Sequence, residues 1–591
     1  MKFPTDSLHL YQALTKLFGE LDEEHLQLIL SIAQQQTYEA GEYVFKQGEI
    51  GNAFYIVLSG RFRALETVDS NIYILGDIST GDPIGEFSLF TKEPHSASIV
   101  ALRRSNLLCI DANQYHTIIK EFPIIANTLT KIIIDRLKHN AHQRKKDAAP
   151  KNIAVVNLQP DNDVSAFTES IEKQFNKMGL GITIYNDETH SHNSNQAVFD
   201  RMEKNPGLNF LSCDAAHISW AKECITYCDL IIVATNFYAN SNLYEIEQKL
   251  NLYADNLMNK KIYLLFLHPE NADMPRHTSN WFKDRTFELH LHIRKNNMAD
   301  VRRFCRIVTH QAVGLVLGGG GARGFAHVGV VKAMQEAGLE FDFIGGTSAG
   351  AIYSVALSFA DFDIQKVMGY CKLAAEKKLT SNDFTMPFLS LMSGKKMRKF
   401  LAEMLGNVFL EDLWVNCYCV STNYTAATVQ VHEKGLACLQ IEASIAIPGV
   451  FPPVIIDKHL HVDGGVVDNL PVAAMQKKPV RHIIAVSLSA ENTTLVDLTK
   501  IPGSWQLFWD KFRRKKKTTL PGLSSILINS ITINSRHKME ASKPNTSIFL
   551  ELDLKEYKFL EWGRWQQIVQ KGYDQTKQYL HNTAVEKQFW K

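Results

Sequence analysis

Residues 312–350 decide the fold of the second half of the chain and read AVGLVLGGGGARGFAHVGVVKAMQEAGLEFDFIGGTSAG. The apolar run 312–317 is typical of a buried strand, and the four glycines that follow lead into a helical pattern over 326–337. A second apolar strand, 341–344, ends in the glycine-flanked turn 346–350, which again precedes a helical pattern. Strands that alternate with helical patterns in this way predict an α/β fold for this region.

The glycine loop 318–324 places backbone N–H groups beside the start of a helix, an arrangement that favours an anion. It satisfies the dinucleotide-binding pattern G-x-G-x-x-G through Gly319, Gly321 and Gly324. A dinucleotide site also needs an acidic residue at the end of the next strand. Here that strand ends in glycines, and its acidic residue, Asp342, lies at the wrong end. A P-loop does not fit either, because no Lys-Ser or Lys-Thr pair follows the glycines.

The turn Gly346-x-Ser348-x-Gly350 has the form of a nucleophile elbow between a strand and a helix. Such a turn projects the serine hydroxyl at the strand end. Glycines are needed at positions 346 and 350 because side chains there would collide with the adjoining elements. The glycine loop one strand earlier would supply N–H donors to the oxyanion that forms when Ser348 attacks an ester carbonyl. The serine then needs a base.

Two kinds of base stay open on these residues alone. Asp463 opens a glycine turn after an apolar strand, although an Asp-Gly-Gly sequence by itself is usually only a turn. The alternative is a histidine, as in the usual triad, and the chain offers His327, His461 and His482. Of these, only His482 fits the chain order Ser, Asp, His that hydrolases with this elbow normally have. We interpret all three as packed or surface histidines.

The glycine loop, the elbow and the Asp-Gly-Gly turn, in this order, resemble the motifs of the patatin-like phospholipase family. The resemblance covers about residues 312–490 and includes the block 443–453, ASIAIPGVFPP, before the aspartate. It implies a Ser348–Asp463 dyad without a histidine, in which Asp463 takes the serine proton, an acyl-enzyme forms and water releases the fatty acid. It also assigns the oxyanion to three backbone N–H groups and the bracing of their loop to an arginine: Gly319, Gly320, Gly321 and Arg323.

Short apolar runs separated by glycines fill residues 30–110 and predict a small β-barrel or jelly roll. The region is similar to a cyclic-nucleotide-binding domain through the stretches 41–49 (GEYVFKQGE), 85–89 (GEFSL) and 94–98 (PHSAS). The resemblance implies that the short helix after Gly85 presents N–H groups to the cyclic phosphate and that Glu86 accepts a hydrogen bond from the ribose hydroxyl.

The cyclic-nucleotide-binding family has an arginine where this chain has His95. Arginine forms a permanent bidentate pair with a phosphate, whereas a histidine of ordinary pKa, about 6.5, is mostly neutral at pH 7. We therefore expect the fold of this family, with a cyclic nucleotide as a possible allosteric ligand. We expect His95 to weaken the binding of that nucleotide. The candidate nucleotide-binding residues are Gly85, Glu86, His95 and Ser96. No metal and no other cofactor is expected.

Length and composition predict a multidomain α/β protein. The chain has 591 residues, several times the roughly 150 of one domain. Its middle region alternates buried strands with helical patterns, which predicts a parallel α/β layer; this region has no Gly-rich phosphate loop, and we expect a structural or docking role. The predicted parts are a cyclic-nucleotide-binding-like domain (1–143), a linker (144–152), an intermediate α/β domain (153–311), a patatin-like domain (312–490) and a C-terminal extension that completes the catalytic domain (491–591).

This domain order is the layout of the neuropathy target esterase family of lysophospholipases. The stretches 209–214 (NFLSCD) and 228–233 (CDLIIV) look like the region that this family carries before its catalytic domain. Two departures are visible, because the chain has one nucleotide-binding-like unit instead of several and no N-terminal membrane anchor. The resemblance therefore does not imply constitutive membrane residence.

Charge and cysteine usage limit the partners and the compartment. The 64 basic and 62 acidic residues give a net charge of +2, which excludes the global basic field of a nucleic-acid coat. Nine cysteines without any C-x-x-C pair indicate neither a disulfide framework nor a zinc site. We find neither a signal peptide nor an apolar run that approaches the ~18 residues of a membrane span. We expect a cytoplasmic protein.

The segment Trp505–Lys517 combines aromatic residues with five consecutive basic ones. Aromatic side chains favour the headgroup level of a membrane, and basic runs are attracted to anionic lipid. The segment is therefore a candidate for peripheral membrane contact. A core-packing helix followed by a solvated charge run stays open as an alternative, and nucleic acid is not an expected partner.

The leading functional hypothesis is a serine esterase that removes acyl chains from phospholipids or lysophospholipids, regulated through the N-terminal domain. Two other classes of function remain to be tested. One is a catalytically silent lipid-binding scaffold, and the other is a cyclic-nucleotide-responsive regulator.

Overall fold

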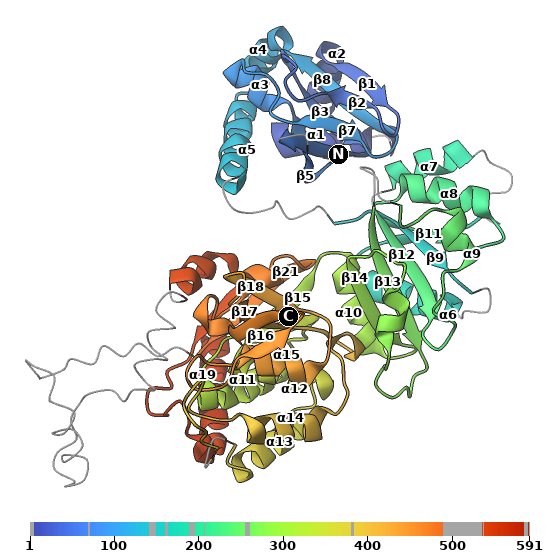
Figure 1. Cartoon of the computed structure of the whole chain (residues 1–591). Helices are drawn as coiled ribbons and strands as arrows, with labels where there is room; N and C mark the ends of the chain where they lie inside the picture. The colour runs from blue at the N-terminus through green and yellow to red at the C-terminus, as the bar shows by residue number, and fades with distance from the viewer. Residues whose placement is uncertain are drawn as a thin grey trace, which may run out of the picture. The chain divides into compact units, whose positions relative to one another are not determined.

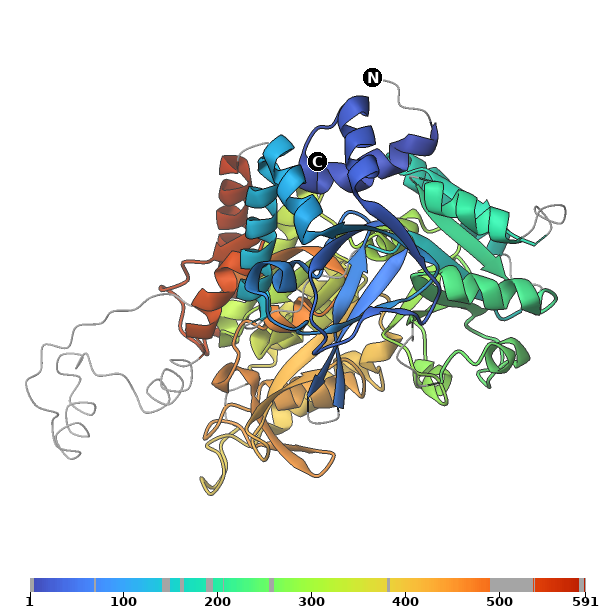
Figure 2. The same cartoon turned by 90° about the horizontal axis from the view of Figure 1, so that it is seen from above.

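A computed structural model gives the architecture of the chain, and its elements are labelled as in Figure 1 (Figures 1 and 2). The structure describes residues 5–68, 71–140, 149–159, 164–187, 195–205, 207–254, 260–379, 383–488, 535, 537–583 and 589. The chain forms two compact units. The first comprises residues 1–268, 282–290 and 295–301, and the second comprises 269–281, 291–294 and 302–591.

The N-terminal part of the first unit is a jelly roll of two four-stranded sheets, with strand orders β1-β8-β3-β6 and β2-β7-β4-β5. All of the recorded pairings in it are antiparallel. The strands are β1 (Gln34–Tyr38), β2 (Tyr43–Phe45), β3 (Ala53–Ser59), β4 (Arg61–Val68), β5 (Asn71–Ser79), β6 (Pro83–Ile84), β7 (Ser98–Ala101) and β8 (Ser105–Asp111). The helices are α1 (Thr5–Phe18), α2 (Glu23–Ile32), α3 (Glu86–Thr91), α4 (Ala112–Glu121) and α5 (Ile124–Asn140).

The jelly-roll prediction is confirmed, and the sequence pattern explains its two cores. Alternate residues of a strand face opposite sides of a sheet. Phe62 and Leu107, for example, are buried in the core formed with β2 and β7, while Phe54 and Ile110 pack with helices α1, α4 and α5. The apolar runs seen in the sequence therefore contribute side chains to two cores, one on each face of the sheet.

The middle part of the first unit is a six-stranded sheet of order β10-β11-β9-β12-β13-β14. Its five strands β10, β11, β9, β12 and β13 are parallel to their neighbours, which confirms the predicted parallel α/β layer. The strands are β9 (Asn152–Asn157), β10 (Ile182–Tyr185), β11 (Leu208–Cys213), β12 (Leu230–Asn236), β13 (Lys261–His268) and β14 (Leu289–Arg294). The helices of this region are α6 (Val164–Lys177), α7 (Asn195–Lys204), α8 (Ile218–Tyr227), α9 (Glu245–Lys249), η2 (Thr278–Phe282) and α10 (Met298–Val308). By the division given above, residues 278–281 of η2, 291–294 of β14 and 302–308 of α10 belong to the second unit.

A buried ion-pair cluster lies within the first unit. Arg103, which precedes β8, pairs with Asp229, which precedes β12, and its Nε lies 2.9 Å from a carboxylate oxygen of Glu203. The guanidinium of Arg61 lies 3.4 Å from Asp229. The two arginines hold the pKa of Asp229 well below its usual range against the opposing effect of burial. This aspartate is therefore ionised inside the protein.

The second unit is built on an eight-stranded sheet of order β19-β20-β17-β16-β15-β21-β22, with β18 paired to β17. Strands β17, β16, β15, β21 and β22 are parallel, and β18, β19 and β20 are antiparallel to their neighbours. The strands are β15 (Ala312–Leu317), β16 (Phe343–Thr347), β17 (Asn416–Asn423), β18 (Thr428–His432), β19 (Val454–Ile456), β20 (His459–Asp463), β21 (Val480–Ser487) and β22 (Ile548–Glu551).

Helices surround this sheet (Figure 1), some packed on its strands, such as α12 and α15, and others on neighbouring helices, such as α19 on α11. They are η3 (Gly321–Phe325), α11 (Ala326–Glu336), α12 (Ala349–Phe359), α13 (Ile364–Glu376), α14 (Lys395–Leu405), η4 (Leu410–Asp412), α15 (Ala437–Ser444), η5 (Gly464–Val466), α16 (Val472–Met475), η6 (Lys543–Asn545), η7 (Trp562–Arg564) and α19 (Trp565–Asn582). Every residue of β15 is buried, as the continuous apolar run of a central parallel strand predicts.

Residues beyond 535 contribute directly to this unit. Strand β22 adds to the sheet beside β21, and helix α19 packs against α11. The two helices approach closely because glycines meet the facing backbone: a Cβ at Gly329 would lie 1.9 Å from the Val569 carbonyl oxygen, and one at Gly572 would lie 2.3 Å from that of Ala326. The segment Trp505–Lys517, our candidate for membrane contact, lies outside the described residues.

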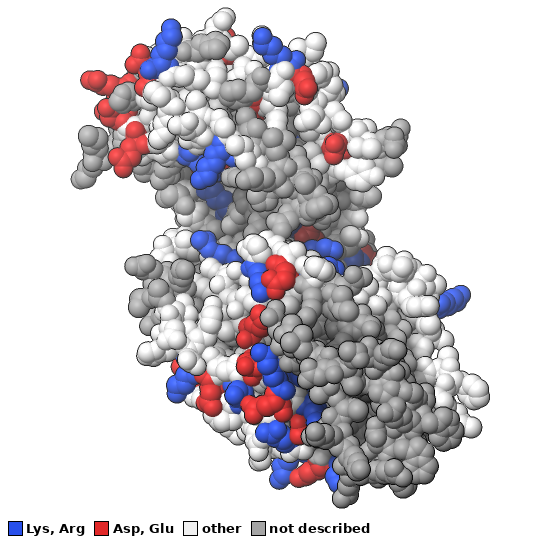
Figure 3. Space-filling view, turned by 90° about the vertical axis from the view of Figure 1, so that its left-hand side faces the viewer, with Lys and Arg blue, Asp and Glu red and all other residues white. Residues whose placement is uncertain are grey.

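Basic and acidic side chains are interspersed on the face of the molecule drawn in Figure 3, in keeping with the small net charge. Within the described ranges, none of the helices combines the length and the apolar character that spanning a membrane requires.

Candidate active site

Ser348 lies between β16 and α12, in the turn that joins strand to helix. Its backbone has φ 54° and ψ −119°, a conformation that a non-glycine residue adopts only at a strained position. A Cβ at Gly346 would lie 2.5 Å from the Leu317 carbonyl oxygen, and one at Gly350 would lie 1.9 Å from it. The two glycines thus allow β15 to pass directly against the turn, the steric role expected from the sequence.

The backbone of the turn is held by a serine from another helix. The Ser348 N–H donates a 2.9 Å hydrogen bond to the hydroxyl of Ser444, at the end of α15. That hydroxyl in turn donates to the Val420 carbonyl at 2.6 Å. Next to Ser348, the Thr347 hydroxyl donates to the carbonyl of Asp468 at 2.9 Å. The strained turn is therefore fixed from two sides.

Asp463 ends β20, which pairs with β17, and its side chain is buried. The Gly465 N–H donates to Asp463 Oδ1 at 2.7 Å. Within the described part of the chain, Oδ2 has no hydrogen-bond partner, so this oxygen is available to accept a proton. Burial raises the pKa of Asp463 to about 6, while the neighbouring Ser348 hydroxyl and the Gly465 N–H act in the opposite direction.

The backbone around the aspartate fixes its position. The Asp463 N–H donates to the Ala446 carbonyl at 2.9 Å, and the Asp463 carbonyl accepts from the Thr422 hydroxyl at 3.1 Å. Gly464 is needed because a Cβ there would lie 2.3 Å from the Val420 carbonyl oxygen. Ala446 belongs to the block that precedes the aspartate in the sequence, so this block positions both Ser348, through Ser444, and the carboxylate.

The glycine loop lies against the serine. A Cβ at Gly319 would meet the Ser348 Cβ at 3.0 Å and the Asn469 Oδ1 at 2.4 Å. The Gly319 N–H already donates to the Asn469 carbonyl at 3.2 Å, and the Asn469 side chain donates back to the Gly319 carbonyl at 3.3 Å. Gly319 therefore supplies space beside Ser348. Gly320 and Gly321 lie at the start of η3, where N–H groups have no partner within the helix.

The far side of the loop rests on residues 557–559. The Arg323 Nε donates to the Tyr557 carbonyl at 2.9 Å, and the Ala322 N–H donates to the Phe559 carbonyl at 2.7 Å. At Gly321, φ is +58°, and a Cβ would lie 2.4 Å from the same Phe559 oxygen. Arg323 thus braces the loop by joining it to a segment more than two hundred residues away.

The three candidate histidines are occupied elsewhere. His327 is buried with Nε2 at 2.9 Å from the Gly318 carbonyl, and burial lowers its pKa to about 4. His461 shares the Ser421 hydroxyl with His432, at 2.8 Å and 2.6 Å. His482 stacks on Phe589 with ring centroids 3.8 Å apart. None of these contacts places an imidazole on Ser348.

The candidate nucleotide-binding residues gather at α3. Gly85 precedes this helix with φ 78°, Glu86 is fully buried, and Ser96 is exposed. His95 is buried, stacks on Phe45 with ring centroids 3.5 Å apart and lies with Nδ1 2.6 Å from the Ser88 hydroxyl. Burial lowers its pKa, against an opposing effect of Glu49. The histidine is therefore neutral and turned into the domain.

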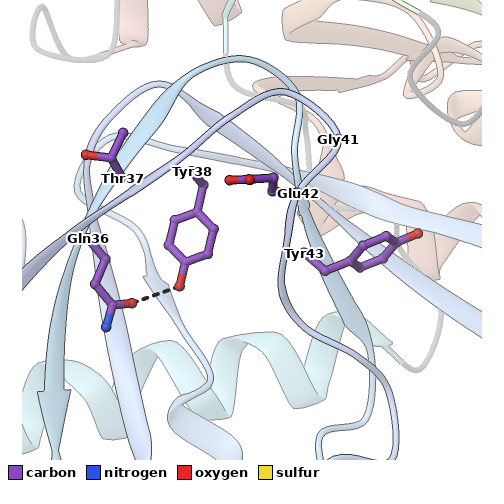
Figure 4. Close-up of a pocket in the computed structure, with 6 residues that line it drawn as sticks. All are labelled: Gln36, Thr37, Tyr38, Gly41, Glu42 and Tyr43. Carbon is purple, nitrogen blue, oxygen red and sulfur yellow. Dashed lines mark hydrogen bonds between the residues drawn. The ribbon is translucent and has the colours of Figure 1, made fainter.

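A hollow elsewhere on the jelly roll involves none of these residues. It is lined by residues of β1, β2 and the turn between them: Gln36, Thr37, Tyr38, Gly41, Glu42 and Tyr43. In Figure 4 the Tyr38 hydroxyl donates to Gln36 across one side of it, at 2.8 Å. The hollow has no nucleophile or cation among its lining residues, and we assign it no role.

Two residues that position the site were not singled out from the sequence. Ser444 lies in the block 443–453, which the sequence analysis marked only as a whole, and Asn469 lies four residues after the Asp-Gly-Gly turn. Their roles depend on hydrogen bonds to chain segments 96 and 150 residues away. No local pattern signals such contacts.

Three family descriptions match consecutive parts of the chain. "Cyclic nucleotide-binding domain" matches residues 35–122, "Neuropathy Target Esterase family P-loop like domain" matches 150–314, and "Patatin-like phospholipase" matches 315–475. The third match contains the glycine loop, the elbow and Asp463.

Similar proteins match most of the chain. Neuropathy target esterase sws of Drosophila melanogaster is 26% identical over 92% of this chain and 42% of its own length. Lysophospholipase NTE1 of Candida albicans is 25% identical over 90% of this chain and 45% of its own. The chain thus spans less than half the length of these curated relatives.

Among solved structures, the catabolite activator protein of Thermus thermophilus matches 28% of this chain and 73% of its own, with 27% identity and a TM-score of 0.21. The chain combines a cyclic nucleotide-binding domain, a P-loop-like domain of the neuropathy target esterase type and a patatin-like phospholipase domain, and it resembles the neuropathy target esterase family.

Proposed function

We propose that the second unit is a serine esterase that hydrolyses acyl esters of phospholipids, and most readily those of lysophospholipids. One observation carries the proposal: Ser348, in a strained elbow beside a glycine loop, faces a buried aspartate whose free oxygen can take its proton. The names of the similar proteins support the same class of substrate.

The first half of the reaction follows from these positions. Asp463 accepts the hydroxyl proton of Ser348 while the serine oxygen attacks the ester carbonyl. The backbone N–H groups of Gly320 and Gly321 stabilise the oxyanion. When the tetrahedral intermediate collapses, the C–O bond to the glycerol breaks, the proton passes from Asp463 to the departing alkoxide, and an acyl-serine remains.

Water completes the cycle in the second half. Asp463 removes a proton from a water molecule that attacks the acyl-serine, the oxyanion forms again at the same N–H groups, and collapse returns the proton to Ser348 as the fatty acid leaves. A base with a pKa of about 6 suits this task better than an ordinary aspartate, because it is ionised at pH 7 and yet about a hundredfold more basic.

Apolar side chains enclose a small space beside the helix that Ser348 begins. A pocket lies between α12, α13 and α14 and is lined by apolar side chains, among them Ile352, Ala356 and Met397. Ile352 lies one turn after Ser348 on α12. The volume of this pocket, about 30 Å³, is far below the roughly 300 Å³ or more of a ligand site, so we do not assign it to the acyl chain of the substrate.

The N-terminal domain is proposed to regulate the esterase, with at most weak binding of a cyclic nucleotide. The stacked, neutral His95 offers a phosphate no permanent charge. The alternative is a lipid-binding scaffold or a regulator without catalytic activity. The following experiment distinguishes this alternative from the esterase.

Purified protein is expected to release fatty acid from lysophosphatidylcholine, and Ser348→Ala and Asp463→Asn are each expected to abolish this release. The matched controls are Ser358→Ala, a buried serine on the same α12, and Asp457→Asn, in the turn between β19 and β20; both keep turnover. A fluorophosphonate probe should label Ser348. Absence of labelling together with absence of turnover restores the scaffold, and turnover by Asp463→Asn contradicts the dyad.

A further inference from the structure

The loop between α13 and α14 exposes four large apolar side chains within six residues. Their exposed fractions are 78% for Phe384, 73% for Met386, 89% for Phe388 and 74% for Leu389. Single exposed apolar residues are ordinary on protein surfaces, but a contiguous group of this kind marks an interaction site. We call residues 384–389 the apolar loop.

The apolar loop is held in place at its base. The Thr385 N–H donates to the Leu391 carbonyl at 3.2 Å, and the Ser393 N–H donates to the Asp383 carbonyl at 2.7 Å. The Ser393 hydroxyl also donates to the Asp383 carboxylate at 2.5 Å. These bonds close the loop in the manner of a hairpin, so the apolar side chains are presented to the outside by a fixed backbone.

The base of the apolar loop rests on the elements that build the active site. The N–H groups of Leu391 and Met392 donate at 2.9 Å to the carbonyls of Gly449 and Val450. Met392 packs in one cluster with Phe451 and Phe559. Phe559 holds the glycine loop, and residues 449–451 follow Ala446, which holds Asp463. The apolar loop is therefore on the rim of the catalytic machinery.

A group of basic residues begins shortly after the apolar loop, with residues 390–394 between them. Helix α14 begins with four exposed cations in five positions: Lys395, Lys396, Arg398 and Lys399. Arg398 pairs with Glu442 and Lys399 lies 3.9 Å from Glu403, whereas Lys395 has no ion pair within the described ranges of the chain. Cations at a helix N-terminus oppose the helix dipole, so their placement does not serve the stability of α14.

We propose that the apolar loop and the basic start of α14 dock on an anionic lipid surface. Apolar side chains enter the boundary between headgroups and acyl chains, while lysines beside them meet the negative surface potential. A protein partner would need only apolar complementarity, whereas a lipid surface accounts for both the apolar group and the adjoining cations. The inference rests on the proposed function in one respect: docking here brings the esterase to the place where its substrate resides.

The test measures binding and hydrolysis separately. Full-length protein carrying Ser348→Ala is sedimented with vesicles of phosphatidylcholine and with vesicles that contain phosphatidylserine in roughly equal amount. The double variant Phe388→Gln/Leu389→Gln is expected to lower the vesicle-bound to free ratio about tenfold or more, since two large apolar side chains lose their burial. Lys395→Gln/Lys396→Gln is expected to weaken binding only to the anionic vesicles. Ile50→Gln, an equally exposed apolar residue of the first unit, serves as the matched control.

Each outcome decides the proposal. Unchanged vesicle binding by the Phe388→Gln/Leu389→Gln variant overturns it, and so does a loss of binding by Ile50→Gln of the same size. The same double variant with Ser348 intact is expected to hydrolyse a water-soluble butyrate ester at the wild-type rate; a lower rate places the loop in the active site instead. A wild-type dimer in light scattering that becomes a monomer in the variant shows that a second copy covers the loop. If wild type binds vesicles but hydrolyses nothing, the proposed function fails while docking stands.

Discussion

The hydroxyl of Ser444 accepts a 2.9 Å hydrogen bond from the backbone N–H of Ser348. Ser348 has the strained backbone of an elbow, and such strain persists only where surrounding contacts over-determine it. Ser444 therefore positions Ser348, the proposed nucleophile.

Replacing Ser444 with alanine is expected to lower kcat without a comparable change in KM. The Ser348 N–H would lose its buried partner, at about 1–3 kcal/mol, which corresponds to roughly 5- to 150-fold if the elbow relaxes before attack. Steady-state kinetics on a soluble ester measures the split. Ser358→Ala is the control, because the Ser358 hydroxyl also donates to a buried carbonyl, that of Val415 directly before β17, at 2.6 Å but does not touch the elbow. An equal loss of kcat in this control would contradict the positioning role.

The rate of hydrolysis is expected to rise with pH around the pKa of Asp463, about 6. Below that pH the carboxyl is protonated and cannot take the serine proton; above it the carboxylate is the active base. A profile of kcat/KM against pH measures the inflection. His482→Gln, which alters a histidine stacked on Phe589, should leave the inflection unchanged. A profile that is flat between pH 5 and 7 would exclude Asp463 as the titrating base.

Asp463→Asn is expected to stabilise the protein at neutral pH while it abolishes activity. The folded-state pKa of Asp463 is raised above its unfolded value, chiefly by burial. Its contribution to stability is therefore greatest below the unfolded pKa and is lost as pH rises through about 6. Thermal unfolding at pH 7 should give a higher Tm for the variant. The corresponding increase in the free energy of unfolding is up to about 3 kcal/mol. The difference should shrink at pH 5, and a Tm below wild type at both pH values would contradict it.

His95→Arg is expected to strengthen cyclic-nucleotide binding. Wild-type His95 is neutral and stacked on Phe45, whereas arginine keeps its charge and pairs with a phosphate through two hydrogen bonds. Titration calorimetry with cyclic AMP and cyclic GMP measures the change. Replacing His95 with glutamine controls for loss of the stacked ring alone. Micromolar or tighter binding by wild type would show that the domain needs no arginine.

The motifs that could be predicted from the sequence are those whose chemistry is local. The elbow around Ser348 and the glycine loop are each contained in a few consecutive residues, because steric contact with a neighbouring strand demands glycine at fixed spacing. The jelly roll and the two α/β sheets could be predicted from apolar periodicity, which is also a property of consecutive residues. Local signals therefore gave the fold class and the positions of the candidate nucleophile and base.

The contacts that could not be predicted join distant parts of the chain. Asn469 already uses the N–H of Gly319, so the sequence motif overstated the number of free N–H groups in the loop. His95 could be recognised as a departure, but its stacking on Phe45 depends on how two strands pack. The exposure of Phe384 and Phe388 could likewise not be predicted, because the sequence pattern of an apolar residue in a loop does not indicate whether its side chain is buried.

The dependence of the glycine loop on Tyr557 and Phe559 has a consequence for biosynthesis. A nascent chain extended as far as residue 490 contains the serine, the aspartate and the glycines, but it lacks the segment on which Arg323 and Ala322 are anchored. If the proposed mechanism holds, the chain acquires Ser348 long before it acquires the support of the glycine loop. Translation order would then delay esterase activity until residues near 560 have left the ribosome.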